Sequence, residues 1–156
     1  MKYKLLILAL IVALLNATVT LQIRTQLANS SGTATNGMYW GVLVDSTDDG
    51  FAVTSTGDIT AFDFTTNGVY GNDSFFVGSS TTVLAPPYGG TGVAANTNPI
   101  TLSGDVSAGD SFGIFWTDKA GGSGVDGDTY GFVSVSGAVL HNDSNTTAFD
   151  TVFIGD

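Results

Sequence analysis

Residues 109–116 read Gly-Asp-Ser-Phe-Gly-Ile-Phe-Trp, and residues 127–134 read Gly-Asp-Thr-Tyr-Gly-Phe-Val-Ser. In both copies a Gly-Asp turn is followed by a hydroxyl residue, an aromatic residue, a glycine and an apolar run. Gly and Asp suit turns, whereas aromatic and β-branched residues suit a pleated, half-buried surface. We therefore predict a β-hairpin, joined by the Gly-rich segment 120–127, at the centre of an all-β core.

The composition extends this prediction to the whole chain. All 14 acidic residues are Asp, and beyond the first four positions the only Lys or Arg residues are Arg24 and Lys119. Because Glu, Lys and Arg are the usual exposed helix formers, and Asp favours turns, long helices are not expected. Turn signals separate many short strand-like segments. The fold class predicted is all-β, a single antiparallel β-sandwich or jelly roll of roughly 8–11 short strands.

The first 17 residues have the features of a secretory signal peptide. Lys2 and Lys4 precede an uninterrupted apolar run at residues 5–15, and Ala17 follows as a small residue. A membrane-spanning helix needs roughly twenty apolar residues, so this run is too short to cross a bilayer. We predict export, cleavage after Ala17, no membrane insertion after cleavage, and one domain at residues 18–156. An uncleaved N-terminal anchor is the alternative.

The charge and the lack of cysteine exclude several classes of function. The net charge is −10, and it becomes about −12 once Lys2 and Lys4 are removed. Such a field repels phosphate groups, so nucleic-acid binding is not expected. Without cysteine there is no disulfide framework and no thiolate chemistry. Cations and neutral or cationic surfaces remain as partners.

The clearest alternation in the sequence follows the predicted cleavage site. The apolar positions are Val19, Leu21, Ile23 and Leu27, and the polar positions are Thr18, Thr20, Gln22, Arg24 and Gln26. A period of two predicts a strand with one buried face. This strand is either the first strand of its own sandwich or a donor strand that adds to the sheet of a neighbouring subunit and builds a fibre.

Aromatic residues concentrate in the predicted strands. They are Trp40, Phe112, Phe115, Trp116, Tyr130 and Phe132. Trp40 lies in the continuous apolar run 38–44, which is typical of a central strand, and the chain closes with a strand at 148–154. We expect these rings in the core. Because Phe115 and Trp116 are consecutive, they point to opposite faces, and the alternative is that one of them is exposed as a ligand platform.

Three acidic clusters are candidate calcium sites. They are Asp45, Asp48 and Asp49; Asp118, Asp126 and Asp128; and Asp105 with Asp110. Calcium takes six to eight oxygen ligands, which Asp carboxylates and main-chain carbonyls of a flexible loop supply. The alternative is ordinary turn chemistry, in which each Asp accepts hydrogen bonds from nearby backbone N–H groups.

The longest stretch without a strand pattern is 85–98, which contains Pro86-Pro87-Tyr88-Gly89-Gly90. A loop of this length in a compact domain is usually functional or poorly ordered. Tyr88 is therefore a candidate stacking platform for a sugar. The alternative is that its ring packs against the domain.

No catalytic constellation stands out. His141 is the only histidine, so no Ser-His-Asp set can be singled out, and one histidine without cysteine cannot form a structural zinc site. The carboxylates lie among Gly, Ser, Thr and Asn rather than in apolar contexts that would raise the pKa of a catalytic acid. We predict that the protein is not an enzyme.

Two stretches carry a resemblance to a protein group. Residues 37–51 read Gly-x-Tyr-Trp-Gly-Val-Leu-Val-Asp followed by Asp-Gly-Phe, and residues 104–116 read Gly-Asp-Val-Ser-Ala-Gly-Asp-Ser-Phe-Gly-Ile-Phe-Trp. This resembles uncharacterised secreted bacterial proteins, many of which carry a PEP-CTERM sorting tail. The resemblance implies an extracellular or envelope-associated, non-catalytic role. The sequence reaches Asp156 without such a tail, so anchoring by that route is not expected.

Together these features predict a secreted, non-enzymatic structural or adhesive protein of the extracellular matrix or cell surface. Self-association would use the N-terminal strand or another sheet edge. The alternative is a calcium-assisted carbohydrate-binding module in which Tyr88 contacts cell-surface glycans. A small secreted hydrolase is the third hypothesis.

Overall fold

The computed structural model describes residues 17–54, 56–82, 90–121, 123–124, 126–141 and 146–150. These residues form eleven strands and no helix, which confirms the predicted all-β class. Accordingly, the described part of the chain offers no helix of the length and apolarity that crossing a bilayer requires. The predicted signal peptide, apart from Ala17, and Tyr88 lie outside the described residues.

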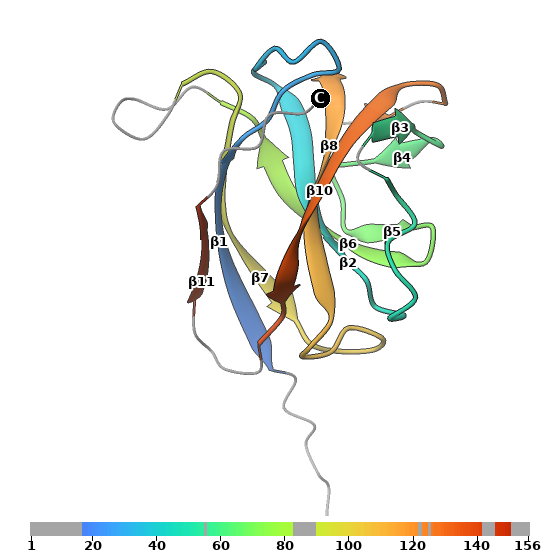
Figure 1. Cartoon of the computed structure of the whole chain (residues 1–156), viewed down its shortest axis with the longest axis vertical. Coiled ribbons are helices and arrows are strands. Elements are labelled where there is room, and N and C mark those ends of the chain that lie inside the picture. Colours follow the sequence, from blue (N-terminus) through green and yellow to red (C-terminus); the bar gives the residue numbers. More distant parts are fainter. Residues whose placement is uncertain are drawn as a thin grey trace, which may run out of the picture.

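The strands form two main sheets (Figure 1). The smaller sheet contains, in order, β11 (Thr146–Asp150), β1 (Thr18–Gln26) and β7 (Val93–Thr101). The larger contains β3 (Thr56–Asp58), β10 (Thr129–Val139), β8 (Ser111–Ala120), β2 (Met38–Val44), β6 (Asp73–Ser80) and β5 (Gly68–Tyr70). A short pair joins β4 (Phe62–Asp63) to β9 (Ser123–Gly124).

The predicted hairpin lies at the centre of the larger sheet. β8 and β10 pair antiparallel, with Gly131 opposite Trp116 and Val133 opposite Ile114, and β2 pairs with the other edge of β8. The Gly-rich connection is not a plain loop, because it contains β9.

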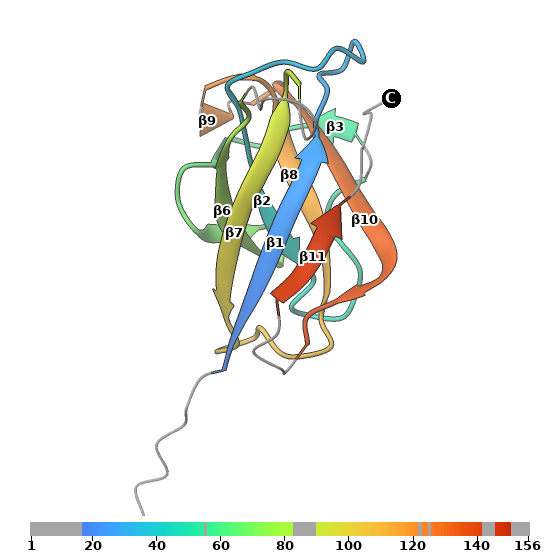
Figure 2. The same ribbon diagram turned by 90° about the vertical axis from the view of Figure 1, so that its left-hand side faces the viewer.

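The smaller sheet departs from the antiparallel expectation at one pair. β1 pairs antiparallel with β7 but parallel with β11, while the other strand pairs of the described chain are antiparallel. A tight hairpin cannot form a parallel pair. β11 reaches β1 after β10 of the larger sheet, so its direction follows from a connection between sheets. Figure 2 shows β7, β1 and β11 side by side on one face of the molecule.

The main core lies between the two sheets. The alternation of the N-terminal strand is confirmed, since Val19, Leu21 and Ile23 are 1–2% exposed. These side chains pack with the residues of the larger sheet that face them, which are Trp40, Val42, Val44, Phe112, Ile114 and Trp116.

A second core covers the opposite face of the larger sheet, which we call the ring cluster. It contains Leu43, Val53, Ile59, Phe64, Phe75, Phe115, Tyr130 and Phe132. The chain between β2 and β6 folds over this face, so that in Figure 1 the elements β3, β4 and β5 lie on the far side of β8 from β1. The larger sheet is therefore buried on both faces.

Because the larger sheet is buried on both faces, both Phe115 and Trp116 lie in a core. Phe115 is fully buried in the ring cluster, and Trp116 is 2% exposed in the core between the sheets. The core prediction is confirmed for both residues, and the alternative that one of them is an exposed platform is wrong. The reason is the second covering layer, which alternation along one strand does not reveal.

Glycines let the rings lie flat against neighbouring strands. A Cβ on Gly113 would lie 2.6 Å from the ring of Phe132, and one on Gly131 would overlap the ring of Trp116. Gly113 and Gly131 are the glycines of the two near-copies. Each copy therefore needs its glycine because the other copy supplies the ring that lies over it.

We predict that Gly131→Ala destabilises the fold by about 1–3 kcal/mol, as overpacking of a filled core does. The ring of Trp116 must move, and its Nε1–H then loses its hydrogen bond to the Ala28 carbonyl oxygen, now 2.9 Å. Urea unfolding measures the change. Gly68→Ala in β5 is the matched control, because its Cβ would meet an atom of Phe62 at an ordinary 3.8 Å. Equal effects of the two substitutions would contradict the explanation.

Candidate functional site

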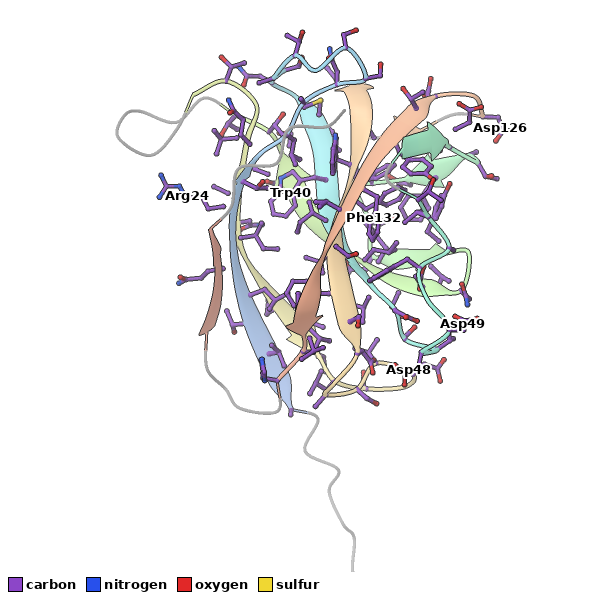
Figure 3. The ribbon with its side chains drawn as sticks, viewed as in Figure 1. Arg24, Trp40, Asp48, Asp49, Asp126 and Phe132 are labelled. Carbon is purple, nitrogen blue, oxygen red and sulfur yellow. The ribbon has the colours of Figure 1, made fainter. Side chains whose placement is uncertain are left out.

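The predicted acidic clusters lie apart from one another, in separate loops except for Asp118, which is in strand β8. Figure 3 shows Asp48 and Asp49 at one end of the molecule, Asp126 at the other, and Arg24 on the side opposite these acidic loops. Within the described ranges, no three His or Asp side chains gather closely enough to hold a metal ion.

In the first cluster, the three aspartates have different environments. Asp45 is buried, and its Oδ2 accepts a hydrogen bond from the Gly50 N–H at 3.0 Å. Asp48 is exposed, with a left-handed φ of 57° that Asp tolerates in turns. Asp49 is also exposed, and it accepts hydrogen bonds from Thr47 Oγ1 at 2.5 Å and Asn72 Nδ2 at 2.7 Å. The Thr47 hydroxyl is the main cause that lowers the pKa of Asp49.

Two aspartates of the second cluster accept hydrogen bonds from the backbone of a neighbouring loop. Asp126 Oδ1 accepts a hydrogen bond from the Ala61 N–H at 2.7 Å, and the Asp128 carbonyl oxygen accepts one from the Ile59 N–H at 2.5 Å. Asp118 lies in β8, and its side chain is outside the described residues. These bonds join the turn before β10 to the chain that covers the ring cluster.

The third cluster forms the turn before β8. Asp110 is 6% exposed and its Oδ2 accepts a hydrogen bond from the Ser107 N–H at 2.7 Å, whereas Asp105 is exposed. Asp49, Asp110 and Asp126 thus all act as acceptors for turns and loops, as the turn-chemistry alternative predicts.

A pair of buried carboxylates lies where β2 ends and β6 begins. Asp45 is 7% exposed and Asp73 is fully buried. Val44 is opposite Ser74 in the β2–β6 ladder, so the next step brings Asp45 beside Asp73. Sequence analysis missed Asp73, because after Gly71-Asn72 it has the pattern of an exposed turn residue.

Each carboxylate of this pair is only half satisfied. Asp73 Oδ2 accepts a hydrogen bond from the Ala52 N–H at 2.7 Å, as Asp45 Oδ2 does from Gly50. The Oδ1 atoms of Asp45 and Asp73 are buried and have no hydrogen-bond partner among the described residues. Burial raises the pKa of Asp73, and the negative charges of Asp45 and Asp49 raise it further.

The remaining candidates do not join this pair. His141 is exposed just after β10, and Tyr88 lies outside the described residues, so its role as a sugar platform stays a prediction. Trp40 and Trp116 are buried in the core. Among the described residues, the one large apolar side chain that is exposed is Val69.

Comparison with protein-family models, with curated proteins and with solved structures found no match. The resemblance to secreted bacterial proteins stays an expectation. Function is therefore inferred from the residues and their geometry.

We predict that Thr47→Val raises the pKa of Asp49 toward its ordinary value near 3.8, because the substitution removes the hydroxyl that stabilises the ionised carboxylate. Since folding lowers this pKa, Asp49 contributes stability above about pH 3.8, and that contribution is lost as the pH falls through the lower pKa of the folded state. Carboxyl ¹³C NMR titration measures the shift.

Asp63 is the internal control for this titration. Hydrogen bonds from Thr65 lower its pKa in the same way, in a different turn. The pKa of Asp63 should stay unchanged in Thr47→Val. A shift of both groups, or of neither, would contradict the assignment.

Proposed function

We propose that this protein is an exported, non-enzymatic structural subunit of the cell surface or extracellular matrix, and that copies associate by exchanging strand β1. The observation that carries the proposal is the position of β1. It is the first described strand of the chain and also the middle strand of the smaller sheet, between β7 and β11.

The burial of β1 supports exchange. Val19, Leu21 and Ile23 are only 1–2% exposed. If β1 left this place, β7 and β11 would each be left with an unpaired backbone edge, and the core between the sheets would open along one row of side chains. The same strand from a second copy fits this place, because its sequence and register are identical.

The connection after β1 provides a hinge. Residues 27–37 cross from the smaller sheet to β2 in the larger one. Within the loop, Asn29 Oδ1 accepts from the Ser31 N–H at 3.1 Å and the Thr33 N–H at 2.9 Å. The loop is also bonded to the larger sheet, because Trp116 Nε1–H donates to the Ala28 carbonyl oxygen at 2.9 Å, and exchange would have to break this bond. Once opened, these eleven residues would span about 36 Å, enough to reach a neighbouring subunit.

Export and a non-catalytic role are supported by the sequence. The N-terminal 17 residues have signal-peptide features, and the resemblance points to secreted proteins. The Asp side chains that hydrogen-bond in the described loops accept from backbone, hydroxyl and side-chain amide groups.

A cysteine pair tests the exchange. Arg24 on β1 is opposite Ala95 on β7, and the chain has no native cysteine. In Arg24→Cys/Ala95→Cys we expect disulfides between chains, because opposite strand positions are close enough to bridge. Non-reducing gel electrophoresis of the assembled protein should show a ladder of covalent multimers that collapses to monomer on reduction.

The control pair is Val69→Cys/Ser74→Cys in the β5–β6 hairpin. These strands adjoin in sequence and do not take part in the exchange, so this disulfide should stay within one chain. If the Arg24/Ala95 pair also forms only within single chains at every protein concentration, strand exchange is wrong.

A further inference from the structure

The half-satisfied carboxylates of Asp45 and Asp73 leave two charged oxygens in the interior. An ionised carboxylate removed from water is unfavourable unless a hydrogen-bond donor or a cation compensates it. Each Oδ2 has one backbone N–H donor, but neither Oδ1 has any described partner. The pair therefore requires a compensating group that side chains of the described chain do not supply.

The two carboxylates face the same side of the sheet. Leu43 and Phe75 are opposite each other in the β2–β6 ladder, and both belong to the ring cluster. Asp45 and Asp73 lie two residues further along the two strands, so their side chains point to that same face. Opposite residues of an antiparallel pair have Cβ atoms about 5 Å apart, close enough for both carboxylates to contact one ion.

The described Arg side chain and the backbone of Lys119 lie away from this pair. Arg24, the one Lys or Arg side chain that the structure describes, is on β1 across the larger sheet from this face (Figure 3). The Ser111 carbonyl oxygen accepts a hydrogen bond from the Asp45 N–H at one end of β8. The backbone of Lys119 is eight residues further along β8, or about 26 Å away.

We propose that Asp45 and Asp73 form a binding site for one calcium ion, which their two Oδ1 atoms contact. Two carboxylates without nitrogen or sulfur ligands favour a hard cation. Calcium accepts irregular oxygen shells, so waters and main-chain carbonyls of the loop at residues 46–51 would supply the other ligands. With only two charged ligands, the expected affinity is in the range of extracellular modules, a Kd of about 10⁻⁴–10⁻³ M.

This site differs from the cluster that the sequence suggests. It keeps Asp45, replaces Asp48 and Asp49 with Asp73, and so joins the acidic loop to β6. Asp49 is held by Thr47 and Asn72, outside the buried pair. The proposal does not depend on strand exchange, because it concerns the opposite face of the larger sheet.

The ion would stabilise the chain between β2 and β6, which covers the ring cluster. Gly50 and Ala52 are bonded to the two carboxylates, and Phe51 between them packs against Phe132 with ring centroids 4.8 Å apart. Neutralising the two carboxylates removes the repulsion between their charges, which stabilises the packing of the chain between β2 and β6 on the ring cluster. Calcium should therefore stabilise the whole domain.

Thermal unfolding of the purified protein tests the site. Relative to EDTA, 10 mM CaCl₂ should raise the Tm by about 5 °C, as expected for a ligand well above its Kd. Calorimetric titration should give one ion per chain. Asp73→Asn should lose both the Tm shift and the binding, and Asp45→Asn provides the same test if Asp73→Asn does not fold.

Asp110→Asn is the matched control, because it also removes one buried aspartate charge, but from a carboxylate without an unpartnered buried oxygen. It should keep the full calcium response. Equal losses in Asp110→Asn and Asp73→Asn would show a general counter-ion effect on an acidic protein and overturn the site. An unchanged Tm of the parent protein in calcium would overturn it as well.

Discussion

The fold depends on aromatic rings that lie over glycines of the neighbouring strand in the larger sheet. Trp116 covers Gly131, Phe132 covers Gly113, and Trp40 covers Gly78. A shift of one residue in register would place side chains under these rings and move every core residue to the other face. Both faces of the larger sheet are buried. Neither face is therefore open to solvent, where shifted side chains could be accommodated. The rings therefore fix the register as well as filling the cores.

Local patterns predicted the elements that need only local information. The alternation at residues 18–27 located β1, the apolar run 38–44 located β2, and the two near-copies located β8 and β10. One local prediction was wrong, because β7 (Val93–Thr101) covers residues 93–98 of the stretch 85–98, in which no strand was predicted. The other gaps were non-local. The chain between β2 and β6 covers a face that one strand's pattern leaves undefined, so the sequence left open an exposed alternative for Phe115, whose predicted place in the core is confirmed. The Asp45–Asp73 pair depends on strand register, and neither residue carries a local signal for it.

Two surface aspartates and one buried aspartate have opposite effects on stability. Asp49 and Asp63 accept hydroxyl hydrogen bonds at the surface, which lower their pKa values, so they favour the folded state at neutral pH and cease to do so in acid. Asp73 is buried and its pKa is raised, so its charged form disfavours the folded state at neutral pH, and protonation relieves this as the pH falls toward 3.8. At Asp73, therefore, the charge of the side chain opposes folding. A bound cation would reverse that effect without a change of pH.

The layered arrangement also bears on how β1 could exchange. Along β2, alternate residues face different cores, with Val42 and Val44 toward β1 and Leu43 toward the ring cluster. Release of β1 opens only the first core, while the ring cluster and its cover remain packed on the other face. Local opening of this kind requires less free energy than global unfolding. In the proposed exchange, the three-layer architecture would therefore let the smaller sheet change partners while the larger sheet keeps its register.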